Sequence, residues 1–557
     1  MCIRDRSIYC TNLDEYLSVP PGATLYQIAQ SYRTTLGFEP VNARVNNLTV
    51  ALDWRLRESC QVEFVGLTEE SGRHTYLRSL CLLFAKALHD ELPHYHLSVR
   101  HSLSGGYFSV VKCGDKGITE EQLALVKRRI DHLIAADLPF ERRTVPAEEA
   151  VQIFTAMGEM DKVDLITSSG QPYVTYHYLD GYPDNYYGSL LLSTGQVQLY
   201  DLVPYLGGVL IRVPALEKPT ELTPFEPQQP MREVFDKQSR LLNLLDVSYV
   251  GSLNKAITTG HFSEIVQVAE AAQEKEIAAI ATEIAEAYER GVRIVLVAGP
   301  SSSGKTTFTK RLRLQLMANY LRPHQLSLDN YFVAREFTPL DDKGEYDYEH
   351  IEALDLELFA SDLRRLLAGE LVDMPIFDFN QGARVYQKEL LQLGEGDLLL
   401  IEGIHALNPR LIPEDLQPLT YNIYISALTA IGLDAHNRIP STDIRLLRRM
   451  VRDHKYRGYS AIDTISRWHS VRAGEERWIF PYQQRANVLF NSALMYEVAV
   501  LKTLAERILY QVPACVQEYS EARRLLRFLE HVRPAPFDVV PSTSLLREFI
   551  GGSSFHY

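Results

Sequence analysis

G-V-R-I-V-L-V-A-G-P-S-S-S-G-K-T-T, residues 291–307, is the segment from which the rest of the chain can be placed. Residues 293–298 form a largely apolar run rich in β-branched residues, which predicts one buried strand. Residues 299–306 then match G-x-x-x-x-G-K-[ST], the pattern of a phosphate-binding loop. Apolar residues recur at helical spacing from Phe308 to Tyr320, and Pro323 is expected to stop that pattern. Strand, loop and helix follow in the order that the motif requires.

The residue types of this loop are those that hold a chain of phosphates. Its two glycines allow backbone N–H groups to turn toward an anion, at a helix N-terminus whose dipole favours negative charge. Lys305 is expected to reach the outer phosphates, and the Thr306 hydroxyl is expected to bind Mg²⁺. A chance match is the alternative, and it arises in roughly a few per cent of chains of this length. The segment therefore predicts nucleotide binding.

The composition is that of a multidomain globular protein. At 557 residues the chain exceeds what one core usually serves, so two to four domains are expected. A net charge of −14 argues against broad binding to nucleic acid or to an anionic membrane. The six cysteines are scattered without a C-x-x-C pair, and no apolar run is long enough to span a membrane. We therefore expect reduced thiols and a cytoplasmic protein.

Two carboxylates follow predicted strands beyond the loop. Asp329 comes directly after the predicted strand 325–328, and Glu402 follows the predicted strand 397–401. The carboxyl ends of parallel strands meet at one edge of a sheet, so both side chains are expected beside the phosphate loop. Phosphoryl transfer needs a group there that accepts the hydroxyl proton, and carboxylates also bind Mg²⁺. Ordinary solvation in a loop is the alternative for either acid.

Four further segments complete a recognisable set: S-L-D-N-Y-F (327–332), P-I-F-D-F (375–379), I-E-G (401–403) and D-I-R-L-L-R-R-M-V-R-D-H-K-Y-R-G (443–458). Together with the loop they resemble the uridine kinase and phosphoribulokinase family over about residues 294–496. The resemblance implies a P-loop kinase fold, a parallel sheet flanked by helices, which uses ATP and Mg²⁺ to phosphorylate the 5′-hydroxyl of a nucleoside. A sugar phosphate such as ribulose 5-phosphate is the alternative acceptor.

The same resemblance implies roles for individual residues. Asp329 becomes the base and acts with Lys305, while Thr306 and Glu402 become the Mg²⁺ ligands. Arginines suit a lid over phosphates because they stay charged and hold phosphate oxygens as a fork. The implied ATP contacts are Gly299, Pro300, Ser301, Ser302, Ser303, Gly304, Lys305, Thr306 and Thr307 of the loop, with Arg449, Arg452 and Arg457 of the lid. The implied substrate contacts are Asp347, Phe377, Phe379, Arg384 and Arg445.

One position departs from this family. Its nucleoside kinases carry a histidine against the pyrimidine two residues before the arginine at 384, and this chain has Gly382 there. Phe377 and Phe379 can still stack on a ring. The base is therefore expected to be read differently.

The front of the chain resembles a second family. V-P-P-G-A-T-L (19–25) and V-N-A-R-V-N-N (41–47) resemble the ubiquitin-like, β-grasp TGS domain of threonyl-tRNA synthetases. Residues 76–213 resemble the second additional domain of those enzymes, which edits mischarged tRNA. The side chains that the family uses for editing or metal binding are replaced here by Arg78, Leu82, Val203 and Gly207. Because these residues do not form a metal site or a proton shuttle, the region is expected not to edit.

The predicted organisation is multidomain, with α/β and α+β parts. Residues 214–230 are proline-rich and indicate a linker, and Ser263 is placed to cap a long helix that ends near Arg290. The predicted domains are a TGS-like domain (8–67), a second additional domain (68–225), a linker with the long helix (226–290), a P-loop kinase domain (291–510) and a C-terminal extension that docks on it (511–557).

Two other functions fit parts of the sequence. TGS domains also accompany GTPases, but no N-K-x-D string for reading guanine occurs in the chain. Alternatively, the front half recognises tRNA or an amino acid, and ATP acts only as a switch. The expected partner is a small molecule, either a nucleoside or a sugar phosphate. No contact with a membrane is expected. A tRNA contact by the front half and assembly into a homo-oligomer both stay open.

Overall fold

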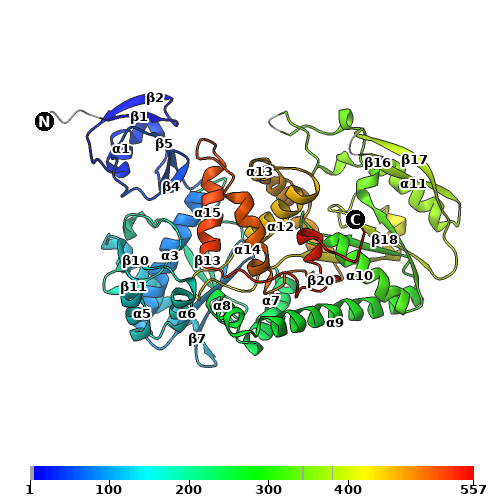
Figure 1. The fold of residues 1–557 in the computed structure, drawn as a ribbon, viewed down its shortest axis with the longest axis horizontal. Coiled ribbons are helices and arrows are strands. Elements are labelled where there is room, and N and C mark those ends of the chain that lie inside the picture. Colours follow the sequence, from blue (N-terminus) through cyan, green and yellow to red (C-terminus); the bar gives the residue numbers. More distant parts are fainter. Residues whose placement is uncertain (1–5, 342–343, 379–380, 557) are drawn as a thin grey trace.

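The computed structural model describes residues 6–341, 344–378 and 381–556. Figure 1 shows an N-terminal part, coloured blue to cyan, beside a larger part that contains the phosphate loop. The long helix α9 (Phe262–Glu289) runs along one side of the molecule, from beside the N-terminal part toward α10 (Figure 1). Within the described residues, no helix is both long and apolar enough to cross a membrane.

The first sheet has five strands in the order β2-β1-β5-β3-β4. β1 pairs with β5 in parallel, and the other neighbours are antiparallel. Asn46 and Asn47 turn β3 into β4 with φ angles of 47° and 61°, which asparagine tolerates better than most residues. The elements are β1 (Arg6–Cys10), β2 (Glu15–Val19), α1 (Leu25–Ser31), α2 (Arg33–Leu36), β3 (Asn42–Val45), β4 (Leu48–Val50) and β5 (Gln61–Val65).

The second region is built around the buried helix α3 (Glu70–Glu91). One sheet beside it has the order β12-β13-β7-β6, with β8 next to β7, and a smaller sheet has the order β11-β10-β9. The elements are β6 (His96–Leu103), β7 (Gly106–Cys113), β8 (Lys116–Gly117), α4 (Glu120–Ala135), β9 (Glu141–Pro146), α5 (Ala147–Ala156), α6 (Met160–Ser169), β10 (Tyr173–Leu179), β11 (Tyr182–Asp184), β12 (Asp201–Tyr205) and β13 (Gly208–Arg212).

Three helices occupy the stretch predicted as a linker with one helix. They are α7 (Gln229–Leu244), α8 (Val250–Thr259) and α9. Ser263 does not cap α9: the cap residue is His261, and Ser263 lies in the first turn. The reason is tertiary, because Phe262 and Ile265 are buried in the core and draw the first turn into the helix.

The central sheet carries the phosphate loop and is entirely parallel. Its order is β15-β18-β14-β19-β20, formed by residues Arg322–Ser327, Asp397–Glu402, Ile294–Ala298, Thr420–Ser426 and Val488–Asn491. The predicted strand and loop thus open a P-loop kinase fold, with α10 (Lys305–Ala318) after the loop. Pro323 does not end that helix, which stops at Ala318. Pro323 lies in β15 instead, and a proline is tolerated there because β15 is an edge strand.

A hairpin and two lid helices complete the kinase part. The hairpin is β16 (Val372–Asp378) with β17 (Ala383–Leu391), next to α11 (Leu356–Leu367). The predicted lid segment is α12 (Ser441–Tyr456), followed by α13 (Ala461–Trp478). Short 3-10 helices span Thr194–Gln196, Leu328–Tyr331, Arg335–Phe337, Ile351–Ala353, Glu414–Leu419 and Phe480–Arg485.

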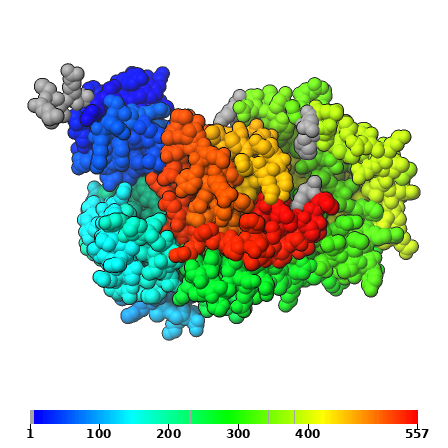
Figure 2. Space-filling view, in the orientation of Figure 1, coloured from blue at the N-terminus to red at the C-terminus, as the bar shows by residue number. Residues whose placement is uncertain are grey.

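The C-terminal helices join the parts of the chain into one body. They are α14 (Glu497–Leu509), α15 (Tyr519–Glu530) and α16 (Arg547–Ile550). A single apolar core contains side chains from α6, α8, α9, α12, α14 and α15. α15 also contacts β4 of the first sheet, where the hydroxyl oxygens of Thr49 and Ser520 are 2.5 Å apart. Figure 2 shows the last residues, coloured red, crossing the surface of the kinase part.

Candidate active site

The phosphate loop connects β14 to α10 in a conformation that its glycines permit. A Cβ atom added to Gly299 would lie 2.1 Å from the Ile425 carbonyl oxygen, so no larger residue fits. Gly304 has a φ of 84°, a left-handed conformation that favours glycine. The Lys305 Nζ donates to the carbonyls of Gly299 and Pro300 at 2.8 and 3.0 Å. The ammonium group is therefore held inside the loop, where outer phosphates are expected.

The two predicted carboxylates both lie next to this loop. Glu402 ends β18, between β15 and β14, and its Oε1 accepts a hydrogen bond from the Thr306 hydroxyl at 3.3 Å. Asp329 lies in the 3-10 turn after β15. A Cβ atom added to Gly403 would lie 2.7 Å from the Leu328 side chain, which shows how closely the two strand ends pack. The sheet therefore brings Lys305, Thr306, Asp329 and Glu402 together.

Desolvation without full charge pairing perturbs all three ionisable groups at the centre. It raises the pKa of Glu402 to about 7, an effect that Lys305 opposes and Asp329 reinforces. Asp329 is exposed to solvent, but the surrounding protein atoms partly desolvate its carboxylate and raise its pKa, although Lys305, Arg457 and Arg452 lower it. Burial lowers the pKa of Lys305 despite the nearby carboxylates. Perturbed groups of this kind are typical of catalytic sites, and Asp329 gains basicity from its surroundings.

The donor set fits a magnesium ion. The Thr306 hydroxyl and the Glu402 carboxylate are hard oxygen ligands, 3.3 Å apart. Mg²⁺ commonly takes only one or two protein oxygens and completes its octahedron with water and phosphate. A site of this type needs no dense ligand cluster, and no group of three or more His, Cys, Asp or Glu suited to a metal occurs in the described part of the chain.

Two arginines of α12 donate hydrogen bonds to Ser301 of the loop. Arg449 donates to the Ser301 hydroxyl at 2.9 Å. Arg445 donates to the Ser301 carbonyl at 3.0 Å and also pairs with the buried Glu475. Both guanidinium groups are thus placed on the loop itself. A substrate contact by Arg445 stays a prediction, and its present partners make it a group that positions the loop.

Arg452 and Arg457 lie farther along the same helix. Both pair with Asp453, with nitrogen–oxygen distances of 2.9 and 3.5 Å. Both also act on the pKa of Asp329, so they face the same space. Their predicted contact with ATP is compatible with this position.

The predicted substrate residues border the hairpin. Phe377 and Arg384 are opposite each other in the β16–β17 ladder. The Arg384 guanidinium lies 2.8 Å from the Asp355 carboxylate. Gly382 has a φ of 67°, and a Cβ atom there would meet the Arg335 side chain at 3.1 Å, so the position is unsuited to histidine. Phe379 falls outside the described residues.

Asp347 lies at a different border of the site. Its Oδ1 accepts from the Glu349 backbone N–H at 3.0 Å, and its own N–H donates to the Pro339 carbonyl at 2.8 Å. Burial, reinforced by Glu475, raises the pKa of Glu349 to about 7, while Arg449 and Lys305 lower it. Glu349 is therefore a further acidic residue whose charge interacts with that of Lys305, and the sequence did not single it out.

Three further residues at the site were missed. Glu475 accepts from the Ser301 N–H at 3.1 Å, and Glu548 of α16 accepts from the Thr307 N–H at 3.2 Å and from its hydroxyl at 2.6 Å. His405 is buried with both ring nitrogens unpartnered in the described structure. His405 lies two residues after Gly403, the last residue of the I-E-G segment, and this closeness to the motif could have identified it. Glu475 and Glu548 are distant in sequence and gave none.

The four N-terminal positions singled out by the sequence, 78, 82, 203 and 207, have structural surroundings. Arg78 donates to the Ser189 carbonyl at 3.1 Å, and Leu82 is fully buried in an apolar core. Val203 pairs with Leu210 inside a sheet, and Gly207 forms the turn between those strands.

Comparisons with known proteins concern the region around the loop. The sequence profile of the Phosphoribulokinase / Uridine kinase family matches residues 294–499. A uridine kinase of Staphylococcus epidermidis is 28% identical over 208 residues, which cover 37% of this chain and 91% of that protein. A uridine kinase of Leuconostoc citreum is 27% identical over 197 residues, which cover 35% of this chain and 85% of that protein.

Among solved structures, D-glycerate 3-kinase from Cryptococcus neoformans is similar with a TM-score of 0.22 and 14% identity, covering 50% of this chain and 87% of that one. The family match spans the loop, both carboxylates and the lid helix α12. Residues 294–499 therefore form a kinase domain of the phosphoribulokinase and uridine kinase family.

Proposed function

We propose that this protein transfers the terminal phosphoryl group of ATP to the hydroxyl of a nucleoside. The observation that carries the proposal is the convergence of Lys305, Thr306, Asp329 and Glu402 on one phosphate loop. Phosphoryl transfer depends mainly on positioning and on stabilising negative charge, and this set supplies both. Lys305 orients the outer phosphates, and Asp329 accepts the proton of the attacking hydroxyl.

Thr306 and Glu402 are the proposed holders of Mg²⁺, which when bound offsets the negative charge of the phosphates. Arg449, Arg452 and Arg457 are proposed to close over the same phosphates. Glu349 and His405 line the acceptor side of Lys305 in this proposal, since both are affected by the Lys305 charge. The chain thus supplies a donor side and an acceptor side on opposite edges of the loop.

The hairpin favours a neutral acceptor over a phosphorylated one. An acceptor of the phosphoribulokinase type brings its own phosphate, which needs an available cation. Asp355 already pairs with Arg384 at 2.8 Å and offsets its charge. Phe377 offers a ring next to Arg384 in the ladder, which suits a nucleobase. Because Gly382 replaces the family's histidine, we propose that the base is not recognised as in uridine kinases.

The experiment is a measurement of ATP consumption and product formation across nucleosides and sugar phosphates, with the full-length chain. We expect turnover with at least one nucleoside and none with ribulose 5-phosphate. Lys305→Ala should abolish turnover while the protein stays folded, because the phosphate clamp is removed. Turnover with a sugar phosphate alone would replace the nucleoside assignment, and a folded Lys305→Ala variant with most of its activity would overturn the site.

For the front half we propose a TGS-like domain (8–67) followed by a non-editing second additional domain (68–225). The strand order β2-β1-β5-β3-β4 around α1 supports the first assignment. The residues at 78, 82, 203 and 207 support the second. We expect no deacylation of mischarged tRNA by the full-length protein, measured as release of the amino acid over time; measurable release would contradict the assignment.

A further inference from the structure

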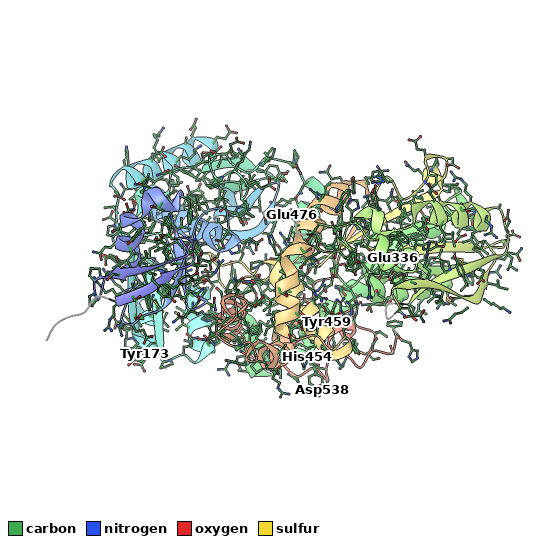
Figure 3. All side chains as sticks on the ribbon, turned by 90° about the horizontal axis from the view of Figure 1, so that it is seen from above. Tyr173, Glu336, His454, Tyr459, Glu476 and Asp538 are labelled. Carbon is green, nitrogen blue, oxygen red and sulfur yellow. The ribbon has the colours of Figure 1, made fainter. Side chains whose placement is uncertain are left out.

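A cavity separate from the phosphate-loop site lies between the front half and the kinase domain. Its volume is about 860 Å³, within the usual range for small-molecule sites. Its walls come from the first sheet, from α3, from α12 and α13, and from α15. In Figure 3, α13 lies between the two parts of the molecule, and Glu476, one of the lining residues, marks its end. Four separate segments of the chain are therefore needed to build this space.

Many charged groups in the cavity wall neutralise one another. Arg44 pairs with Glu63 and Glu69 at the edge of the first sheet. Arg524 binds both oxygens of Asp443 at 2.7 and 2.8 Å. Arg524 also pairs with Glu521 at 2.7 Å, so Arg44 and Arg524 each already have two carboxylate partners.

Two arginines of α3 have only neutral partners. Arg73 donates to the Thr223 hydroxyl at 2.9 Å, and its buried Nε has no partner in the described structure. Arg78 donates to the Ser189 carbonyl at 3.1 Å and to the Thr75 hydroxyl at 3.4 Å. Neither guanidinium forms a salt bridge within the described residues. A buried cation without a counter-charge is costly, and the cost is relieved when an anion binds.

Arg438 adds a third positive charge from the kinase side. Its guanidinium lies over the Tyr107 ring, 4.8 Å from the ring centre, and has no carboxylate partner among the described residues. Burial lowers the pKa of His74 well below its usual value, and Arg524, Arg78, Arg438 and Arg73 lower it further. The fields of these arginines therefore meet at one place in the cavity wall.

Burial lowers the pKa of Arg78, as it lowers that of His74. Together with the neighbouring Arg524, it lowers the pKa of Arg78 to about 10. Arg523 and Arg527 of α15 also line the cavity, as do the carboxylates Glu70, Glu476, Glu518 and Glu521. The excess of positive charge thus lies around Arg73, Arg78 and Arg438, in a protein whose net charge is −14.

We propose that this cavity binds a small molecule that carries one or more phosphate groups, held by Arg73, Arg78 and Arg438. A single carboxylate offsets only one of three charges, whereas a phosphate group carries nearly two at neutral pH. Guanidinium groups bind phosphate oxygens as a fork, and two of these come from α3 while the third comes from the kinase domain. The ligand therefore bridges the two parts of the molecule.

The site is separate from the phosphate loop but touches it through one residue. Arg445 lines the cavity, and it also donates to the Ser301 carbonyl of the loop at 3.0 Å. The proposed function does not require the cavity, since Arg73, Arg78 and Arg438 have no role in the proposed phosphoryl transfer. The inference therefore stands or falls independently of the kinase assignment.

The test uses the full-length chain with Lys305→Ala, which weakens phosphate binding at the loop. Calorimetric titrations with inorganic pyrophosphate, a nucleoside monophosphate and ribose 5-phosphate should show saturable binding of at least one of them. Adding Arg78→Gln with Arg438→Gln should weaken that binding about tenfold or more, because two charge-assisted contacts are lost. Arg128→Gln, on the exposed side of α4, removes the same charge from the same region and should leave binding unchanged.

A second measurement covers the case in which the double variant does not fold. Arginine-selective labelling of the unaltered chain, read by mass spectrometry, should show Arg78 and Arg438 protected by pyrophosphate while Arg128 stays reactive. Equal labelling with and without pyrophosphate would overturn the proposal, as would binding that survives the double substitution. Absence of saturable binding by all three phosphates would do the same. Binding of structured RNA alone would replace the small ligand with a nucleic-acid contact.

Discussion

Lys162, which is fully buried, and Lys305, which is half-buried, each have two carboxylates near them, in different parts of the molecule. The Lys162 Nζ lies 3.0 Å from Asp184 and 3.3 Å from Asp434. The Lys305 Nζ donates to backbone carbonyls, and its carboxylate neighbours Asp329 and Glu402 keep raised pKa values. Burial disfavours the charged form of both lysines, but only around Lys162 do the acids outweigh it and raise the lysine pKa.

The Lys162 network joins the front half to the kinase domain. Asp184 also accepts a hydrogen bond from His436 Nδ1 at 2.7 Å. Burial would raise the pKa of Asp184, but His436 and Lys162 outweigh burial and lower this pKa well below its usual value. Lys162 thus has a carboxylate on each side of the interface, although burial still raises the pKa of Asp434. Around Lys305 the charged groups are not fully paired within the protein. We propose that a bound nucleotide and Mg²⁺ supply the missing counter-charges. The difference separates a structural cluster from a catalytic one.

The largest effect on this comparison is expected from Asp329→Asn. The variant keeps shape and hydrogen bonding but loses the base, which typically contributes on the order of 100- to 10,000-fold in rate. ATP affinity should barely change, because the loop supplies it. The measurement is the turnover rate at increasing Mg²⁺: a rate restored to near wild type at high Mg²⁺ would place Asp329 among the metal ligands.

The next effect is expected from Lys162→Ala, read as stability. Asp184 and Asp434 would be left buried without their cation, which typically costs about 3–5 kcal/mol. The matched control is Lys127→Ala, whose ion pair with Asp201 is partly exposed and should contribute less than about 1 kcal/mol. Urea unfolding measures both, and equal losses in the two variants would show that the buried network has no special role.

Glu402→Gln should increase the free energy of unfolding, whereas Lys162→Ala should decrease it. The measurement uses protein without Mg²⁺ or nucleotide. An acid whose pKa is raised by folding stabilises the protein at low pH, and this contribution is lost as pH rises from about 4.5 to about 7. The variant should therefore match the wild type near pH 5 and be more stable near pH 8, by about 2–3 kcal/mol. Lower stability of the variant at pH 8 would contradict an uncompensated charge at this position.

The smallest effect is expected from Glu548→Gln. This carboxylate accepts from the Thr307 N–H, a group of the kind that cradles phosphates, so it competes with the nucleotide for the same donor. Removing its charge should improve ATP affinity by about 1 kcal/mol, roughly fivefold. Equilibrium binding of ATP measures this, with Glu286→Gln on the exposed side of α9 as the control. Weaker ATP binding by the variant would instead make Glu548 a residue that shapes the loop.

The sequence located the kinase part well because its signals are local. The strand at 294–298, the loop and the strand that ends at Glu402 were all placed by short patterns, and the structure confirms those elements. The sequence failed where distant packing decided the outcome. Ser263 looked like a cap, but the burial of Phe262 extended the helix past it. Pro323 looked like a helix end, but it lies in an edge strand.

By itself the sequence determined the phosphate loop and the parallel-sheet kinase fold. Loop geometry depends on glycine and on neighbouring residues, so a short string is enough to specify it. Only the tertiary structure brought Glu475 and Glu548 to the loop N–H groups and placed Lys162 against Asp434. It also gathered Arg73, Arg78 and Arg438 around one cavity. Charge interactions act through space, and residues hundreds of positions apart acquire their partners only when the domains pack.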